Sequence, residues 1–213
     1  MAKTFFTSDH HFGHANILRY CPTTRPYRSV DDMNVDYWAK WNEVVGPDDT
    51  VWYLGDFSLK FTQIEAWLPQ LNGHKKMLLG NHDAGFKTLT RQQTDRYLAS
   101  GFESVGLFAD VELDGVRFAM SHFPYRVPER YLSKNSQIAE RQWKCAEKSL
   151  EPRARSEDAL LHGHIHQHWR GNKLPARLPA LNVGVDAWDG APVEGSVLVA
   201  AYWALLDKKR MAS

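Results

Sequence analysis

Five short clusters of side chains that can bind metals or transfer protons each follow a hydrophobic run in this chain. In sequence order they are Asp9-His10-His11, Gly55-Asp56, Gly80-Asn81-His82-Asp83, Ser121-His122 and Gly163-His164-Ile165-His166. Together they supply enough oxygen and imidazole donors for two metal ions. Carboxylate and imidazole ligands suit Mn²⁺, Fe and Zn²⁺ better than Ca²⁺, which prefers oxygen ligands alone. The clusters therefore predict metal-assisted attack of hydroxide on a phosphate ester.

Short β-prone runs precede four of these clusters, and each run is expected to be a buried strand. They cover residues 4–7, 50–54, 76–79 and 159–161. Strands of an α/β sheet place the loops that follow them along one edge, which is where ligands bind. Clusters that are far apart in the sequence can therefore converge, and His122 can join them from a strand over residues 116–120.

The segments between these runs carry helical patterns. Ser29 can cap a helix whose apolar residues extend to Val44, and Ile64 to Leu71 form a second apolar stripe. A third helix is expected over residues 87–99, and one helical insert near residues 135–150. In the second half, residues 104–113, the turn Asp114-Gly115 and residues 116–120 predict a hairpin, followed by strands over residues 181–185 and 196–203. This order predicts an α/β fold with a mixed sheet.

The bulk properties of the chain are those of an ordinary globular protein. Its 213 residues predict a single domain over 1–213, with 43% hydrophobic and 24% charged residues. The net charge of +1 argues against tight, salt-sensitive binding to nucleic acid, although a nucleic-acid substrate stays possible. Two distant cysteines, Cys21 and Cys145, predict free thiols. No run has the length of a signal peptide or a membrane span, so we expect a cytoplasmic protein without a membrane partner.

The order of the five clusters resembles the calcineurin-like metallophosphoesterase family. The pattern of that family is D-x-H, GD, GNHD or GNHE, a lone His and GHxH, and it is matched from residue 5 to about residue 186. The start D-x-H-F-G-H-x-N, at residues 9–16, is similar to that of a small bacterial and phage branch. Residues 121–124 and 182–186 fit that branch too. The resemblance implies two mixed β-sheets packed as a sandwich and flanked by helices, in four layers.

The resemblance also implies how the metal ligands are shared. One metal ion would be held by Asp9, His11 and His166. The second would be held by Asn81, His122 and His164. Asp56 would bridge both ions. The implied cofactors are two divalent transition-metal ions, with Mn²⁺ as the first choice and Fe, Zn²⁺ or Ni²⁺ as alternatives.

Further residues would act on the substrate. By the same resemblance, His82 would stand near the leaving-group oxygen as general acid, oriented by Asp83. The alternative for His82 is that it only braces Asn81. His14 and Asn81 are candidates to contact the substrate, although His14 could equally be a capping or surface residue. His10, between two ligands, is expected to face away from the site.

The expected activity is hydrolysis of phosphodiester bonds in nucleotide or nucleic-acid-like substrates by a metal-bridging hydroxide. The second cluster continues as Phe57-Ser58-Leu59-Lys60 and lacks the phosphate-binding arginine of the GDxxDRG pattern found in many family phosphatases. This departure favours a phosphodiesterase over a phosphomonoesterase. The same residues would also suit a nuclease, or a scaffold that binds metal without catalysis.

Residues 125–155 form a possible substrate-selecting insert. Basic side chains alternate there with Tyr125, Tyr131 and Trp143, a composition that can bind a nucleotide base or single-stranded nucleic acid. Acidic residues share the segment, which favours a solvated helix of mixed charge. Because the segment follows His122 directly, it could also form a rim around the site.

Overall fold

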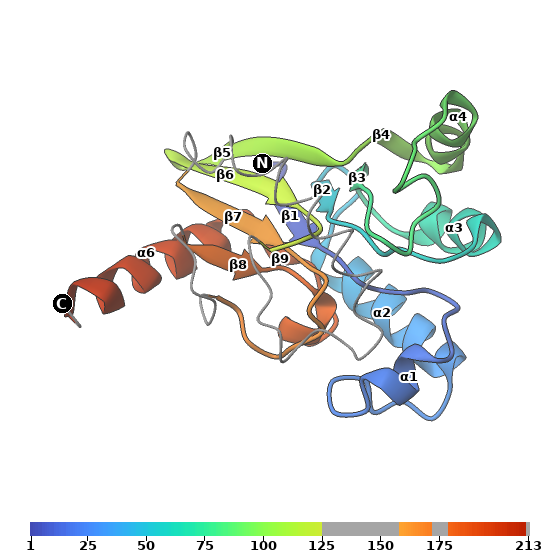
Figure 1. Ribbon diagram of the computed structural model, residues 1–213, viewed down its shortest axis with the longest axis horizontal. Coiled ribbons are helices and arrows are strands. Elements are labelled where there is room, and N and C mark those ends of the chain that lie inside the picture. Colours follow the sequence, from blue (N-terminus) through green and yellow to red (C-terminus); the bar gives the residue numbers. More distant parts are fainter. Residues whose placement is uncertain (125–157, 172–178, 212–213) are drawn as a thin grey trace.

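The computed structural model of the protein describes residues 1–124, 158–171 and 179–211. Two mixed β-sheets form its centre (Figure 1). The first has the order β4-β3-β2-β1-β9, with strands Phe102–Gly106, His74–Leu78, Thr50–Tyr53, Thr4–Thr7 and Val193–Glu194. The second has the order β5-β6-β7-β8, with strands Phe108–Leu113, Val116–Ser121, Ala159–His162 and Ala180–Asn182. The possible insert at residues 125–155, and the helix expected near residues 135–150, lie outside the described residues.

Each sheet contains one antiparallel pair among otherwise parallel strands. β1, β2, β3 and β4 run parallel, and β9 pairs antiparallel with β1. β5 and β6 form an antiparallel hairpin, while β6, β7 and β8 are parallel. The parallel strands aim the loops that follow them at a common edge. The expected α/β class, with two mixed sheets and flanking helices, is confirmed.

Alternating residues of β1 belong to two different hydrophobic cores. Phe5 packs in the core between the first sheet and its helices, whereas Phe6 packs in the core that also contains Phe118 and Leu161 of the second sheet. Successive side chains of a strand point to opposite faces, so the first sheet is buried on both. A strand buried on both faces reads as a continuous apolar run. This is why the short runs before the clusters could be recognised as strands.

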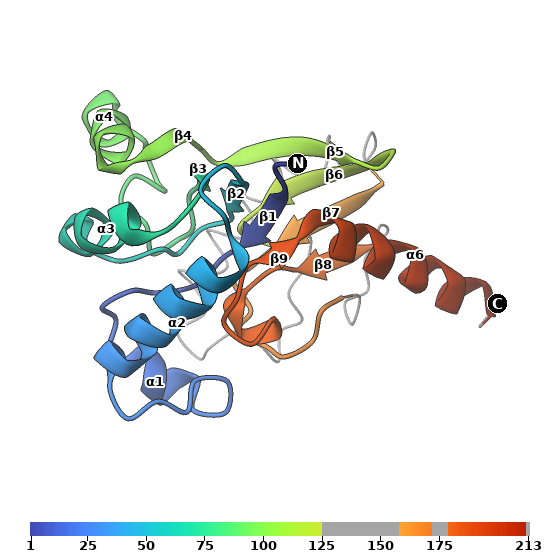
Figure 2. The same ribbon diagram turned by 180° about the vertical axis from the view of Figure 1, so that it is seen from behind.

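Helices α1 to α4 pack beside the first sheet (Figure 2). They span Ile17–Tyr20, Val30–Val44, Phe61–Trp67 and Arg91–Ser100, and a 3₁₀ turn, Leu68–Gln70, follows α3. α2 begins as expected, with the Ser29 hydroxyl accepting a hydrogen bond from the Asp32 N–H at 3.0 Å. α4 begins four residues later than expected because Thr90 and Gln93 form a capping box there. It ends at Gly101, whose φ is 116°.

Three expectations about the second half were wrong. The strand expected over residues 181–185 covers only Ala180–Asn182, and Val185 begins a 3₁₀ helix. Residues 104–113 belong to two strands instead of one. β4 is an edge strand of the first sheet, and β5 is an edge strand of the second. Residues 196–203, expected as a strand, lie in helix α6, Gly195–Met211. Its residues Leu198, Val199 and Tyr202 share one face and pack against both sheets. That packing outweighs the β propensity of the valines.

The predicted hairpin turn is present. Asp114 and Gly115 have φ angles of 48° and 79°, as a two-residue turn with two left-handed positions requires. In the described part of the chain, no helix is long and apolar enough to cross a membrane.

Candidate metal centre

The loops after β1, β2, β3, β6 and β7 converge, and they bring the candidate ligands into two groups. The atoms that could hold a metal ion lie within 4.8 Å of one another in each group. The first group contains Asp9, His11 and His166. The second contains Asp56, His122 and His164. Side chains as far apart in the sequence as His11 and His166 are thus brought together, as the convergence of strand-end loops predicts.

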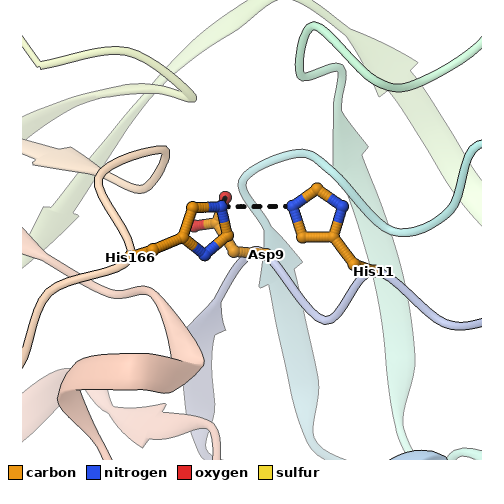
Figure 3. Close-up of side chains that lie close together, drawn as sticks. All are labelled: Asp9, His11 and His166. Carbon is orange, nitrogen blue, oxygen red and sulfur yellow. Dashed lines mark hydrogen bonds and ion pairs between the residues drawn. The ribbon is translucent and has the colours of Figure 1, made fainter. Parts of the chain in front are cut away.

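In the first group, two imidazoles face each other beside a carboxylate (Figure 3). His11 Nε2 lies 3.3 Å from His166 Nε2, and His166 Nε2 lies 3.9 Å from Asp9 Oδ1. Asp9 and His11 come from the loop after β1, and His166 comes from the loop after β7. The first sheet and the second sheet therefore each contribute to this group.

In the second group, His122 is at the centre. Its Nε2 lies 3.2 Å from His164 Nδ1, 3.2 Å from Asn81 Oδ1 and 3.3 Å from Asp56 Oδ2. Asp56 Oδ2 also lies 3.5 Å from His11 Nε2 in the first group. The Asp56 carboxylate thus stands between the two groups, where a bridging ligand would have to be.

One oxygen of each aspartate is held by the protein, and the other is free to bind a cation. Asp9 Oδ2 accepts hydrogen bonds from the Ser8 hydroxyl at 2.6 Å and from the His164 N–H at 2.9 Å, and Asp56 Oδ1 accepts one from the His82 N–H at 2.9 Å. Within the described segments, Asp9 Oδ1 and Asp56 Oδ2 are buried and have no hydrogen-bond partner. A buried carboxylate oxygen without a hydrogen bond is costly unless a cation is present. The donor set therefore fits divalent metal ions.

The backbone of the site is held in an uncommon conformation. Seven described residues other than glycine have a positive φ, and five of them are candidate ligands: Asp9, His11, Asp56, His164 and His166. Such conformations cost energy and persist where the surrounding structure imposes them, often at functional sites. Gly80 and Gly163 add a second constraint. A Cβ at Gly80 would collide with the Asp56 carboxylate, and one at Gly163 would collide with Ser8 and Asp9.

Three ionisable groups of the site, His11, His164 and Asp56, have the charge states that metal ligands require. Burial lowers the pKa of His11 and of His164 well below the ordinary value, so both imidazoles are neutral at neutral pH. Burial alone would raise the pKa of Asp56. The nearby His122 and His11 outweigh burial and hold that pKa well below its usual range. These three groups can bind a metal ion without first losing protons. His122, whose pKa is lowered by burial but raised to about 9 by Asp56, must lose a proton first.

His82 and His14 lie at the open side of the first group. The ring of His82 is 5.2 Å from that of His11 and 6.1 Å from that of His14, measured between centroids. His82 is exposed and His14 is half-buried. Both rings can therefore meet a molecule that enters from solvent, and their roles toward a substrate stay predictions.

Asp83 has contacts that differ from the expected one. Its carboxylate accepts hydrogen bonds from the backbone N–H groups of Asp56, Phe57 and Gly80, at 2.6, 3.0 and 2.8 Å. Among the hydrogen bonds of the described residues, none joins Asp83 to the ring of His82. Asp83 thus fixes the loop that carries Asp56. This role differs from the expected one, which was to orient His82.

His10 faces away from the ligands, as expected. Its Nδ1 lies 2.8 Å from the Tyr53 hydroxyl, and its ring stacks on Phe12 at a centroid distance of 5.1 Å. Burial, together with the charge of Arg25, lowers its pKa to about 3. His10 is therefore a neutral core residue between two ligands that point the other way.

Sequence reasoning missed one buried residue of the site, Arg25. Its guanidinium pairs with Asp186, and both side chains lie beside His166. Burial alone would raise the pKa of Asp186, but Arg25 holds it well below the usual range. Asp186 belongs to one of the segments that fit the phage branch. No local pattern marks Arg25, because its partner lies 161 positions away.

Comparison with known proteins gives full-length relatives. No family model matches the chain. The Gene 66 proteins of Mycobacterium phages D29 and L5 are each 31% identical to it, over 203 and 204 residues. These alignments cover 88% of this chain in both cases, and 90% and 88% of the respective relatives.

One of the solved structures that were compared shares the architecture. A protein of unknown function from Aquifex aeolicus, AQ665, aligns with a TM-score of 0.70 and 25% identity, covering 94% of this chain and 100% of that one. A structure described as a novel archaeal phosphodiesterase is less similar, with a TM-score of 0.42, 19% identity and coverage of 85% and 83%.

The two-sheet fold and the five clusters gathered at its strand ends are those that the resemblance to the calcineurin-like metallophosphoesterases implied. By its similarity over 88% of its length, the chain belongs to the family of the Gene 66 proteins of phages D29 and L5.

Proposed function

We propose that this protein is a binuclear metal-dependent phosphoesterase that hydrolyses phosphodiesters of nucleotide or nucleic-acid-like substrates. The observation that carries the proposal is the position of Asp56 Oδ2. It is buried, has no hydrogen-bond partner among the described residues and lies within 3.5 Å of an imidazole from each ligand group. A carboxylate in that position suits two cations better than one.

The chain's own side chains would divide the work of binding. Asp9, His11 and His166 would hold one ion, and Asn81, His122 and His164 the other. Asp56 would contact both. When bound, two divalent ions would lower the pKa of a water molecule to a value near 7. They would also stabilise negative charge on the phosphate oxygens. We propose Mn²⁺ as the native metal, because the mixed carboxylate and imidazole set suits it.

The exposed histidines would act on the substrate. His82 has its backbone N–H fixed by Asp56 and its ring beside His11, so it can hold a proton for the departing oxygen. His14, whose ring lies 5.5 Å from that of His11, would bind a phosphate oxygen. Asn81, whose Oδ1 lies 3.2 Å from His122 Nε2, would contact the substrate from the second group.

A preference for diesters over monoesters follows from the few cations that the described residues offer to a doubly charged phosphate. The loop after Asp56 continues to Lys60 without an arginine, and the nearby Arg25 is fully buried in its pair with Asp186. A monoester carries one more negative charge than a diester and gains more from such a cation. We also propose that the protein acts in the cytoplasm, in keeping with the free thiol of Cys21.

The test is hydrolysis of bis-p-nitrophenyl phosphate and p-nitrophenyl phosphate by the metal-stripped protein after Mn²⁺ is added. We expect turnover of both, with a higher kcat/KM for the diester, and loss of both activities in Asp56→Asn. A higher kcat/KM for the monoester would favour a phosphomonoesterase. Manganese binding without hydrolysis of either compound would favour the non-catalytic scaffold.

A further inference from the structure

A buried ion pair, to which the proposed chemistry gives no role, lies against the candidate metal centre. Arg25 and Asp186 are 1% and 5% exposed. Arg25 Nε donates to Asp186 Oδ1 at 3.0 Å, and Nη2 donates to Oδ2 at 2.7 Å. Arg25 follows α1, and Asp186 lies in the 3₁₀ helix Val185–Ala187 after β8. The pair therefore joins distant parts of the chain beside the first ligand group.

The remaining N–H groups of Arg25 hold the loop that carries two ligands. Nη2 donates to the Asp9 carbonyl at 2.6 Å, and Nη1 donates to the His10 carbonyl at 3.1 Å. Nη1 also approaches the Met33 sulfur at 3.8 Å. A guanidinium has five N–H groups, and these contacts give an acceptor to all five. Arg25 thus ties Asp186 to the segment in which Asp9 and His11 have positive φ.

The same contacts determine which nitrogen of His166 carries hydrogen. His166 Nδ1 lies 2.9 Å from Asp186 Oδ2 and 3.1 Å from Arg25 Nη2. The two Nη2 hydrogens already have acceptors, the Asp9 carbonyl and Asp186 Oδ2. An ionised carboxylate can only accept, so His166 Nδ1–H must donate to it. In the neutral ring, Nε2 then keeps its lone pair, on the side that faces His11 and Asp9.

We propose that Arg25 and Asp186 are positioning residues for the first metal ligand group. Asp186 fixes the tautomer and rotation of His166, and Arg25 holds both Asp186 and the loop of Asp9 in place. This inference rests on the proposed function, because it takes the first group to bind a cation. A carboxylate that orients a metal-binding imidazole typically strengthens metal affinity by about 10–100-fold.

The second ligand group has separate support, so the effect should be confined to one ion. His122 Nδ1 lies 2.8 Å from the Leu54 carbonyl, which fixes that ring without help from Arg25 or Asp186. Loss of the pair should therefore weaken one of two metal sites. A purely structural ion pair would have no such selectivity.

The first experiment is a Mn²⁺ titration by calorimetry of the metal-stripped full chain and of Asp186→Asn. We expect two sites in the wild type, one of them weakened about 10–100-fold in the variant and the other unchanged. Asp36→Asn is the matched control, since its carboxylate pairs with Lys40 on α2, and it should bind as the wild type does. Two unchanged sites in Asp186→Asn would overturn the inference. A wild type that binds no Mn²⁺ would instead overturn the proposed function.

A second experiment separates positioning from stability. The double variant Arg25→Met/Asp186→Leu removes both charges together, so that no unpaired charge is left in the core. We expect it to unfold near the wild-type temperature and still to lose affinity at one site. Wild-type affinity at both sites would show that the pair is only structural.

A third measurement needs no variant. Ring ¹⁵N chemical shifts of His166 in the metal-free wild-type protein should show the Nδ1–H tautomer. A predominant Nε2–H tautomer, or an even mixture of the two, would contradict the assignment of hydrogen made from the contacts of Arg25.

Discussion

At the scale of single residues, each aspartate of the centre is anchored on one side and free on the other. Asp9 and Asp56 each offer one oxygen to N–H or O–H donors of the protein and leave the other buried without a partner in the described segments. The anchored oxygen sets the rotation of the carboxylate. The free oxygen is then aimed at a fixed point, as a ligand needs to be.

The types of the ligand residues could be predicted from the sequence, but their supports could not. Asp9, His11, Asp56 and the histidines after β6 and β7 were found because they follow recognisable strands. Arg25 was missed because its function depends on contacts across the whole fold. The contact between Asp83 and His82 was expected only from the family resemblance. In the structure, the Asp83 carboxylate instead accepts hydrogen bonds from backbone N–H groups.

His82→Ala tests the general acid. The exposed ring makes no contact that the ligand groups need, so we expect metal affinity to be kept and kcat for the diester to fall by roughly 10²–10⁴. His74→Ala, at the exposed start of β3, is the control and should leave kcat unchanged. Wild-type kcat in His82→Ala would remove His82 from the mechanism.

The thiol of Cys21 provides a prediction about pH. Burial, followed by the charge of Asp186, raises its pKa to about 11. The reactive thiolate is thus about 100-fold scarcer at pH 8 than for an ordinary cysteine. In a Cys145→Ser background, alkylation by iodoacetamide should be slower by that factor than in the urea-unfolded protein. The rate should also keep rising to pH 10, and a plateau near pH 9 would contradict the pKa.

At the scale of elements, local signals predicted the first half of the fold better than the second. β1 and β2 are short runs of mostly buried apolar residues, and β3 ends in the buried Met77 and Leu78. α2 has a cap and a regular apolar stripe. In the second half, the chain leaves the first sheet after β4 and enters the second sheet at β5, with only Leu107 between them. No local sequence pattern marks this change of sheet. α6 begins with valines that favour strands, so only its packing against both sheets shows that it is a helix.

Ser29→Ala tests the start of α2. The variant loses the hydrogen bond from the Asp32 N–H, and we expect the free energy of unfolding to fall by about 1 kcal/mol. Ser104→Ala, at an exposed position of β4, should change it by less than about 0.5 kcal/mol. Urea denaturation of the metal-free proteins measures both. Equal effects of the two substitutions would mean that the cap contributes nothing.

At the scale of the whole molecule, the centre draws on both sheets at once. The first sheet contributes Asp9, His11 and Asp56, and the second contributes His122, His164 and His166. The sandwich of two sheets was expected only from the family resemblance. Strand periodicity predicts which runs are strands, but not into which sheet each is placed, because strand pairing depends on contacts distant in sequence.

Metal binding should therefore stabilise the fold as a whole. Ions that bind only the folded chain raise the free energy of unfolding by about 2.7 kcal/mol at 100 times the dissociation constant. We expect Mn²⁺ to raise the unfolding temperature of the wild type and of His82→Ala equally, and to raise that of Asp56→Asn much less. An equal rise in Asp56→Asn would show that the stabilising ion binds elsewhere.

The spread of the ligands along the chain also sets an order of events during synthesis. Asp9 and His11 leave the ribosome early, whereas His166 and its supporting Asp186 follow only after more than 150 further residues have been translated. Until then the nascent polypeptide has only part of the first ligand group. We therefore expect metal loading to be a late step of maturation, and a ribosome-stalled fragment that stops short of residue 166 to carry no complete first group.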